Sequence, residues 1–326
     1  MHSKIHTTNN SNLKHLHFKT CAILGFGSQG RAQALNLRDS GIKVLIGLPA
    51  KSKSRKAAQQ EGFQVMTTAE AVKKTDLLCL ALPDLKIPEI FKKEIEPHLR
   101  PGMTLLFLHG FVVHYNLIDL RPDLNVMMVS PKGGPGPNVR AAFLAGKSVP
   151  TAIAVHQDFS KKSRQLALAW AHGIGSKKHD IIPTTFAEET ESNLFAEQAV
   201  ICGGVSALLQ RGFETLIEAG ISPELAYIST LRELKLTTDL IHQAGISGMR
   251  AAISETAKYG DLTVGPTIID ASVKKKMQRA LKKIQSGQFA KAWIKEYQSG
   301  LKNYHDLLKQ ASQHSIEQVG KKLKKH

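Results

Sequence analysis

Short apolar runs separated by helix-like stretches characterise the first half of the chain. Gln29–Ser40 has the hydrophobic spacing of a helix, and Gly41 follows it where a C-terminal cap is expected. The runs predicted to be strands are Cys21–Gly25, Lys43–Leu48, Leu77–Leu82, Thr104–His109, Asn125–Ser130, Thr151–His156 and Asp180–Pro183. Because strands that alternate with helices form parallel sheets, this half is predicted to be a doubly wound α/β domain.

The pattern changes after Phe186. Apolar residues then recur at helical spacing and no strand-like run interrupts them convincingly. The long helical segments are Ala187–Ala219, Pro223–Ala244, Ser272–Gln285 and Gln288–Gln310. We therefore predict an α/β domain over residues 1–184 and an all-helical domain over residues 185–326.

A glycine-rich loop follows the first predicted strand and opens the first predicted helix. Gly25-Phe-Gly-Ser-Gln-Gly30 has the spacing G-x-G-x-x-G. In this context the first glycine permits the tight turn, the second lets the backbone approach a pyrophosphate, and the third lets helix and strand pack closely. The helix N-terminus supplies N–H groups to the phosphates. The loop therefore indicates a Rossmann-type dinucleotide-binding domain rather than an incidental turn.

The end of the second predicted strand indicates which dinucleotide is bound. An NAD-specific site carries Asp or Glu here for the ribose 2′-hydroxyl. This chain has Gly47-Leu-Pro49, followed by Lys51-Ser-Lys-Ser-Arg-Lys56. Cations and hydroxyls without a carboxylate suit a 2′-phosphate, so NADP(H) is preferred. A merely solvated basic loop is the alternative.

Composition and charge restrict the class of protein. The 326 residues are 42% apolar and 22% charged, which is typical of a globular enzyme. The 44 Lys and Arg against 27 Asp and Glu give a formal charge of +17, which favours polyanions. Apart from Gly320–His326 the cations are scattered, and no aromatic residues interleave with that cluster. We therefore prefer a solvated basic surface to a nucleic-acid site.

The chain is expected to be cytoplasmic. No run approaches the length and apolarity of a membrane span, and Met1–Lys19 lacks the apolar core of a signal peptide. Cys21, Cys79 and Cys202 lie far apart in apolar segments. We expect them to be buried, reduced thiols, which indicates a reducing compartment.

Further motifs extend along the whole chain. They are Leu82-Pro-Asp84, His109-Gly-Phe111, Pro131-Lys-Gly133, Glu188-Glu-Thr-Glu191, Glu197-Gln-Ala-Val-Ile-Cys-Gly-Gly204, Gly212-Phe-Glu-Thr-Leu216, Glu233-Leu-Lys-Leu236 and Thr256-Ala-Lys-Tyr-Gly260. In this order and spacing, from about Leu13 to Leu323, the chain resembles the short class (class I) of ketol-acid reductoisomerase. That resemblance implies two steps on the route to valine and isoleucine. A magnesium-dependent alkyl shift converts an acetohydroxy acid, and NADPH then reduces the resulting 2-keto acid.

The resemblance also implies a knotted helical C-terminal domain and an active site shared between two subunits, hence a homodimer or a higher homo-oligomer. The residues that it places at NADP(H) are Gly25, Phe26, Gly27, Ser28, Gln29, Gly30, Ser52, Ser54, Asp84 and Gly136. Those that it places at the reacting centre are His109, Lys132, Glu233 and Ser254, the last as a hydrogen-bonding group for the substrate. A histidine at a strand end is more often structural, but the Gly-Phe context of His109 favours a catalytic role.

The metal ligands implied by the resemblance depart from the family pattern. Magnesium prefers anionic oxygen ligands, and the family supplies four carboxylates in two pairs spaced i and i+4 on helices. Here the first pair is Asn193 and Glu197, and the second is Ser229 and Glu233. With Asn193 and Ser229 as weak ligands, we expect one Mg²⁺ ion or weak binding. The acids between residues 188 and 191 occur in the family motif too, so we do not count them as compensation.

Smaller departures point the same way. Pro49 stands where the family usually has an Arg, and the loop after Lys132 is one residue longer than usual and lacks its His. The main hypothesis is an NADPH-dependent ketol-acid reductoisomerase with a weakened metal site, acting on acetohydroxy acids of the 2-acetolactate type. One alternative is an NADPH-dependent 2-keto acid reductase that lacks the isomerase step. The other is a catalytically silent dinucleotide-binding paralogue.

Overall fold

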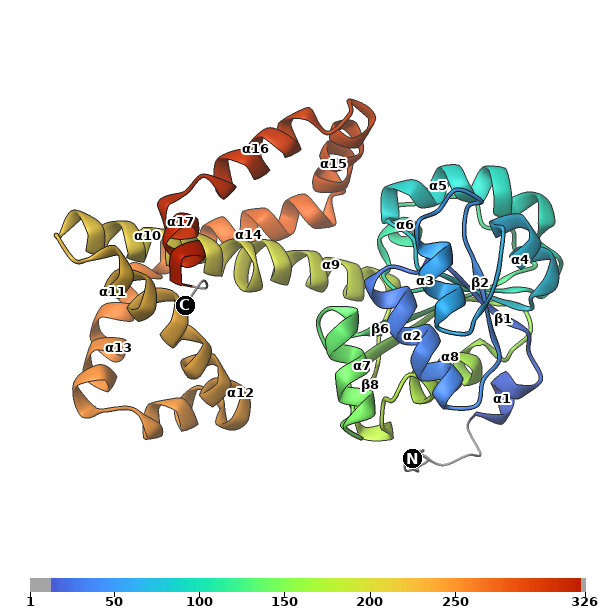
Figure 1. The fold of residues 1–326 in the computed structure, drawn as a ribbon, viewed down its shortest axis with the longest axis horizontal. Coiled ribbons are helices and arrows are strands. Elements are labelled where there is room, and N and C mark those ends of the chain that lie inside the picture. The colour runs from blue at the N-terminus through green and yellow to red at the C-terminus, as the bar shows by residue number, and fades with distance from the viewer. Residues whose placement is uncertain (1–12, 324–326) are drawn as a thin grey trace. The chain divides into compact units, whose positions relative to one another are not determined.

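The structure is a computed structural model that describes residues 13–323 (Figure 1). The chain divides into two compact units, Met1–Thr190 and Glu191–His326. The boundary predicted from the sequence, between residues 184 and 185, lies slightly earlier, just before helix α9 (Phe186–Ala196) begins. Each unit is described by itself below.

Eight strands form a single sheet in the first unit, in the order β3-β2-β1-β4-β5-β6-β7-β8. Their bounds are β1 Cys21–Leu24, β2 Val44–Gly47, β3 Gln64–Met66, β4 Leu77–Leu80, β5 Thr104–Phe107, β6 Asn125–Pro131, β7 Thr151–Asp158 and β8 Ile181–Pro183. The short edge strand β3 was not predicted, because three residues show no clear alternation. All the other strands lie within or close to the predicted runs.

The predicted doubly wound sheet is mostly parallel, with one antiparallel pair of strands. β7 runs antiparallel to β6, whereas all other neighbours are parallel. The connection between β6 and β7 includes α7 (Gly136–Leu144). It ends next to the residues where it began, because the Lys132 N–H after β6 donates to the carbonyl of Pro150 before β7. β7 therefore starts at the carboxyl edge of the sheet and runs back across it.

Apolar residues cover both faces of the sheet. In β1, Cys21 and Ile23 belong to one core cluster, and Ala22 and Leu24 to the other, as the two-residue period of a strand requires. Both clusters are covered by helices, and Thr67 and Glu70 form a capping box at the start of one of them. The helices are α1 Lys14–His17, α2 Ser28–Asp39, α3 Ser54–Gln60, α4 Thr68–Lys74, η1 Asp84–Lys86, α5 Ile87–Ile90, η2 Phe91–Ile95, η3 Glu96–His98, α6 Phe111–His114, α7, α8 Ser163–Gly173 and η4 Lys178–Asp180.

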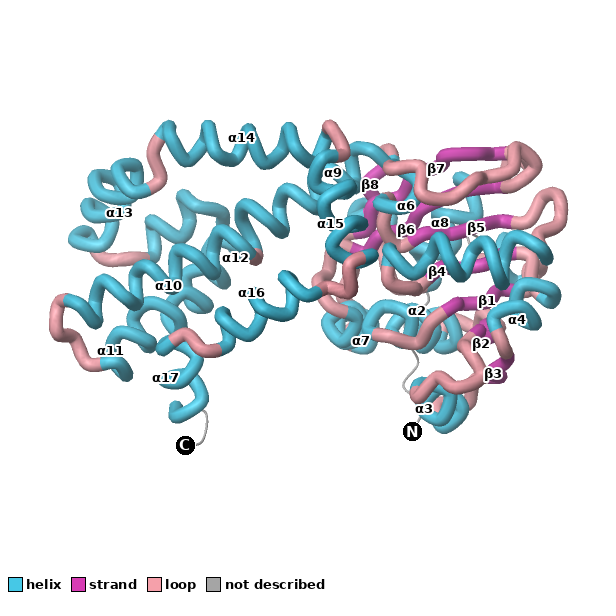
Figure 2. Tube along the Cα trace, turned by 90° about the horizontal axis from the view of Figure 1, so that it is seen from above, coloured by secondary structure: helices cyan, strands magenta, loops and turns pink. Residues whose placement is uncertain are grey.

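The second unit consists of helices in the part of the chain that the structure describes (Figure 2). After α9 they are η5 Glu197–Ile201, α10 Gly203–Glu218, α11 Pro223–Tyr227, η6 Ile228–Arg232, α12 Glu233–Ala252, α13 Glu255–Ile268, α14 Ala271–Gln285, α15 Gln288–Gln298, α16 Lys302–Ser312 and α17 Ser315–Leu323. The segment predicted as one helix over Gln288–Gln310 is two, because Gly300 and Leu301 adopt positive φ angles of +88° and +62°. The all-helical prediction is otherwise confirmed, and the knot stays a prediction.

Much of the apolar surface of the second unit is exposed. Its core cluster contains five buried residues around Phe213 and Tyr227. By length and composition alone, the continuous helix Phe186–Glu218 could span a membrane, and 6% of its most apolar 18 residues are buried. The expectation that no segment is long and apolar enough for a membrane span is therefore corrected. One helix of this kind is weak evidence for a membrane span. Cys202 is exposed on this helix, so the prediction of a buried thiol there was wrong, whereas Cys21 and Cys79 are buried.

Candidate active site

The glycine loop has the geometry that its three glycines permit. Gly25 has a φ of +100°, and a Cβ atom there would lie 2.3 Å from the Ala81 carbonyl oxygen. A Cβ atom on Gly30 would lie 2.5 Å from the Gly25 carbonyl oxygen, so β1 and α2 approach too closely for a side chain. Around Gly27, in contrast, no atom lies within 4 Å of the Cβ position. The space next to Gly27 is therefore open to a ligand at the N-terminus of α2.

This loop borders a pocket of about 330 Å³ at the carboxyl edge of the sheet. The pocket is lined by Gly27, Ser28, Gln29, Gly30, Leu80, Ala81, Leu82, Pro83, Asp84, Ile87, Phe107, Leu108 and His109. Gly136 lies next to it, since its N–H donates to Ser28 Oγ at 2.8 Å, and Gln29 Nε2 donates to the Gly134 carbonyl. Gln29 Oε1 is buried and has no hydrogen-bond partner among residues 13–323, so it is an acceptor that a ligand could satisfy.

Ser52 and Ser54 lie outside this pocket, on the loop after β2 and at the first residue of α3. Ser52 Oγ accepts a hydrogen bond from the Ser54 N–H. The Arg55 guanidinium donates to the carbonyls of Leu48 and Met66, so it braces the loop. Lys51 and Lys53 are exposed on the same loop. The two lysines and the two hydroxyls therefore remain the groups suited to a 2′-phosphate.

A buried carboxylate that we did not select from the sequence organises the other side of the site. The Glu189 side chain is 1% exposed. One of its oxygens lies 2.8 Å from His109 Nδ1 and accepts the Gly110 N–H at 3.0 Å. The other accepts from Ser130 Oγ at 2.9 Å and from Lys132 Nζ at 2.5 Å. Glu189 on α9 thus joins the ends of β5 and β6, and it holds both predicted catalytic groups of this unit.

The charges in this cluster support one another. Burial alone would raise the pKa of Glu189, but the hydrogen bonds and charges of His109 and Lys132 lower it to about 2. Burial alone would lower the pKa of His109, but the hydrogen bond and charge of Glu189, with a smaller contribution from Asp84, raise it above its ordinary value of 6.5. The cluster therefore holds one carboxylate with an ammonium and an imidazole that favours its charged form.

The His109–Glu189 pair predicts a pH dependence of stability. Since the pKa of His109 is raised by folding, the pair stabilises the fold fully below the ordinary pKa of 6.5 and loses this contribution as the pH rises through the raised value. We expect the free energy of unfolding, measured in urea between pH 6 and pH 9, to fall with rising pH. His109→Gln should remove this part of the slope, and His179→Gln, at an exposed histidine, should keep it.

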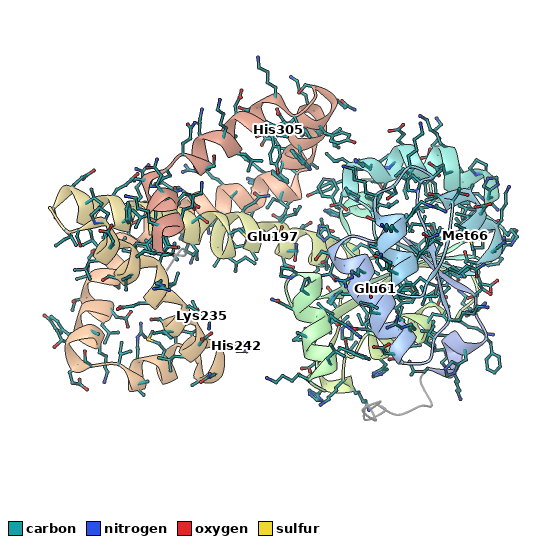
Figure 3. All side chains as sticks on the ribbon, in the orientation of Figure 1. Glu61, Met66, Glu197, Lys235, His242 and His305 are labelled. Carbon is teal, nitrogen blue, oxygen red and sulfur yellow. The ribbon has the colours of Figure 1, made fainter. Side chains whose placement is uncertain are left out.

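The residues expected to bind magnesium lie in the helical unit. Glu197 begins η5, Glu233 begins α12 and Ser229 lies in η6. Figure 3 shows Glu197 on the helix continuous with α9, and Lys235, close to Glu233 in sequence, on α12. Asn193 Nδ2 donates to Glu197 Oε1 at 2.9 Å, so its amide nitrogen engages an oxygen that a metal would need.

This donor set does not fit two divalent ions. Only the two carboxylates of this set would balance the four positive charges of two Mg²⁺ ions. An amide and a hydroxyl stand in place of the other two anionic ligands. Among the described residues no three His, Cys, Asp or Glu side chains are grouped so that they could hold a metal.

Ser254, expected to contact the substrate, is the N-cap of α13, where its Oγ accepts the Ala257 N–H at 3.2 Å.

A Rossmann-type sheet with a glycine loop beside a buried His–Glu–Lys cluster, joined to an all-helical unit, defines a dinucleotide-binding protein of the oxidoreductase class. Comparison with family models matches residues 15–180 to "Acetohydroxy acid isomeroreductase, NADPH-binding domain" and residues 186–326 to "Ketol-acid reductoisomerase, C-terminal domain". The chain belongs to the ketol-acid reductoisomerase family.

Individual relatives agree with this assignment. The chain is 48% identical over 323 residues to ketol-acid reductoisomerase (NADP(+)) of Pyrobaculum calidifontis, covering 99% of this chain and 98% of that protein. It is 52% identical over 303 residues to the protein of the same name from Saccharopolyspora erythraea, covering 93% and 91%. Among solved structures, an NADH-preferring ketol-acid reductoisomerase from an uncultured archaeon matches with a TM-score of 0.93 and 40% identity, covering 96% of each chain. The sequence assignment to this family is confirmed.

Proposed function

We propose that this protein is an NADPH-dependent ketol-acid reductoisomerase that acts on acetohydroxy acids of the 2-acetolactate type, in the biosynthesis of valine and isoleucine, and that its hold on magnesium is weak. The observation that carries the proposal is the pocket at the glycine loop, which reaches His109 of the buried cluster. Family membership supports the substrate class. We also propose a cytoplasmic location.

The residues of the first unit have separable tasks. Bound NADPH would supply the hydride. The backbone at Gly27 and the N–H groups at the start of α2 suit its pyrophosphate, and the orphaned Gln29 Oε1 suits a donor of the cofactor. Lys132 Nζ and the imidazole of His109 would stabilise negative charge on a substrate oxygen and deliver a proton to it. Glu189 favours the charged form of His109 and holds both side chains in place through its hydrogen bonds.

The preference for NADPH rests on the loop after β2. The relatives from Pyrobaculum calidifontis and Saccharopolyspora erythraea are NADP(+) enzymes by name, whereas the solved relative prefers NADH. Lys51 and Lys53 add positive charge beside the hydroxyls of Ser52 and Ser54, and residues 47–56 contain no carboxylate. This composition supports binding of a 2′-phosphate, so we propose that NADPH is used in preference to NADH.

The metal and the assembly belong to the same proposal. Because the donor set does not fit two divalent ions, we propose that at most one Mg²⁺ binds, weakly, through Glu197 and Glu233. The exposed apolar side chains of the helical unit, including Leu236, Leu262 and Ile268, support a homodimer or a higher homo-oligomer that covers them.

The test is a magnesium titration of NADPH oxidation by the full-length protein. With 2-acetolactate we expect turnover that rises with Mg²⁺ and does not saturate at concentrations that saturate a four-carboxylate relative. The 2-keto acid that the alkyl shift would produce should be reduced at lower Mg²⁺. Reduction of this keto acid without any turnover of 2-acetolactate would replace the proposal with a 2-keto acid reductase. Binding of NADPH without turnover of either would replace it with a silent paralogue.

Gly27 separates cofactor binding from folding. A methyl group on Gly27 meets no protein atom within 4 Å, and its φ of −82° is allowed for any residue, so Gly27→Ala should leave the melting temperature unchanged. We expect its Kd for NADPH to rise at least roughly tenfold, since the methyl group would occupy the space for the pyrophosphate. Gly25→Ala, at a φ of +100°, should instead lower the melting temperature. Calorimetry and titration of NADPH fluorescence measure both effects.

A further inference from the structure

Two pockets lie at the amino edge of the sheet, opposite the glycine loop. Each has a volume of about 420 Å³. One lies where β5 and β6 begin and is lined by Lys14, His15, Phe18, Lys19, Gly102, Thr104, Asn125, Ser160, Lys162 and Leu166. The other lies where β2 and β3 begin and is lined by His17, Phe18, Lys19, Thr20, Lys43, Leu45, Gln64 and Lys74. Phe18 and Lys19 line both, so the two pockets flank one aromatic side chain.

Phe18 is exposed although it directly follows a helix that packs on the core. Its side chain is 88% exposed, whereas Leu13 and Leu16 beside it are 5% and 0% exposed in the main core cluster. Helix α1 packs against α8, and Figure 1 shows the two helices close together. A single exposed apolar residue is unremarkable by itself. Here it lies between two pockets, directly after a helix that packs on the core, and a flat ligand can stack on it.

The lining of both pockets carries positive charge only. It includes five lysines and two histidines, and no Asp or Glu. None of the five lysines forms an ion pair within residues 13–323. The nearby carboxylates of Asp76 and Asp158 accept the backbone N–H groups of Thr20 and Ser163.

From this combination we propose that the amino edge of the sheet binds single-stranded nucleic acid, with a base stacked on Phe18 and phosphates on the lysines of both pockets. Cations on each side of one exposed ring match a strand whose successive phosphates flank a stacked base. The five lysines come from four separate segments of the chain, so the fold gathers charges that look scattered along the sequence. The surface is independent of the active site, which uses the other edge of the sheet.

The experiment measures binding of a fluorescein-labelled oligothymidylate 12-mer to the full-length protein by anisotropy, over a series of NaCl concentrations. If four or five phosphates are neutralised, log K should fall with log[NaCl] with a slope of about −3, since each phosphate contributes about −0.7 for a single strand. Phe18→Ala should weaken binding roughly tenfold through the lost stacking. Lys19→Gln combined with Lys43→Gln should make the slope shallower by about 1.4.

The control is Lys92→Gln combined with Lys147→Gln, which removes the same charge from two exposed lysines of the same unit outside both pockets. This variant should bind as the unmodified protein does, and all the variants should keep their NADPH oxidation rate. Equal weakening by both lysine pairs would show diffuse attraction by the net charge and overturn the proposal. Unchanged binding by Phe18→Ala would overturn it too. So would equal affinity for a polyglutamate peptide, which would indicate an acidic protein partner instead.

Discussion

Glu189→Gln is expected to lower kcat for NADPH-dependent turnover by about two to three orders of magnitude, within the range contributed by a positioned acid or base. The reason is the loss of the carboxylate that the structure shows bonded to both His109 and Lys132. Glutamine has nearly the same shape but no charge, so the pKa of His109 should fall, because burial then acts without the opposing charge of Glu189. The measurement is the pH profile of kcat/KM for NADPH oxidation with the 2-keto acid.

The control for this variant is its neighbour, Glu188→Gln. Glu188 is exposed and accepts a hydrogen bond from Thr184, so its loss should change kcat less than about twofold. Glu189→Gln should also lose the acid dependence of stability that the wild-type side chain confers. With a folded pKa of about 2 against an ordinary 4.5, its contribution is present above pH 4.5 and is lost as the pH falls towards 2. Wild-type activity in Glu189→Gln would contradict the role assigned to this carboxylate.

The fold was largely predictable because its signals are local. Buried parallel strands are continuous apolar runs, and the helices of the second unit have a clear period in sequence. What failed depended on tertiary contacts or on single residues. β3 is stabilised by pairing with β2 rather than by its own pattern, and β7 turns back because of the connection through α7. The break between α15 and α16 needs only Gly300 and Leu301, which a periodic pattern passes over.

The site was predictable in the same uneven way. The glycine loop carries its geometry in six adjacent residues, so its glycines could be interpreted from spacing alone. Glu189 lies 80 residues from His109 in the sequence and is one of three nearby acids, so no local feature distinguishes it from Glu188 or Glu191. A helical period would place it one turn before Asn193, on the same face. This helical spacing does not by itself distinguish Glu189 from its neighbours. What distinguishes Glu189 is its contact with His109 and Lys132, which exists only in the folded chain.

Asn193→Asp combined with Ser229→Glu is expected to tighten Mg²⁺ binding at least roughly tenfold and to raise turnover of 2-acetolactate at low Mg²⁺. The change doubles the number of carboxylates in the donor set and removes the amide N–H that Asn193 donates to Glu197 at 2.9 Å. Reduction of the 2-keto acid, which we assign to Lys132, His109 and NADPH, should change much less. Titration calorimetry with MgCl₂ and the magnesium dependence of both rates measure these effects.

A matched control distinguishes ligand geometry from net charge. Gln243→Glu combined with Gln298→Glu adds the same charge at two exposed positions of the helical unit, and it should leave Mg²⁺ affinity and both rates as they are. If the variant Asn193→Asp with Ser229→Glu and this control bind Mg²⁺ equally well, then Asn193 and Ser229 are not what weakens magnesium binding in this chain. If only the variant Asn193→Asp with Ser229→Glu gains both Mg²⁺ affinity and 2-acetolactate turnover, the loss of two carboxylates is what weakens the alkyl shift more than hydride transfer in this chain. The difference between the rates with 2-acetolactate and with the 2-keto acid would then measure how strongly the alkyl shift depends on four carboxylate ligands.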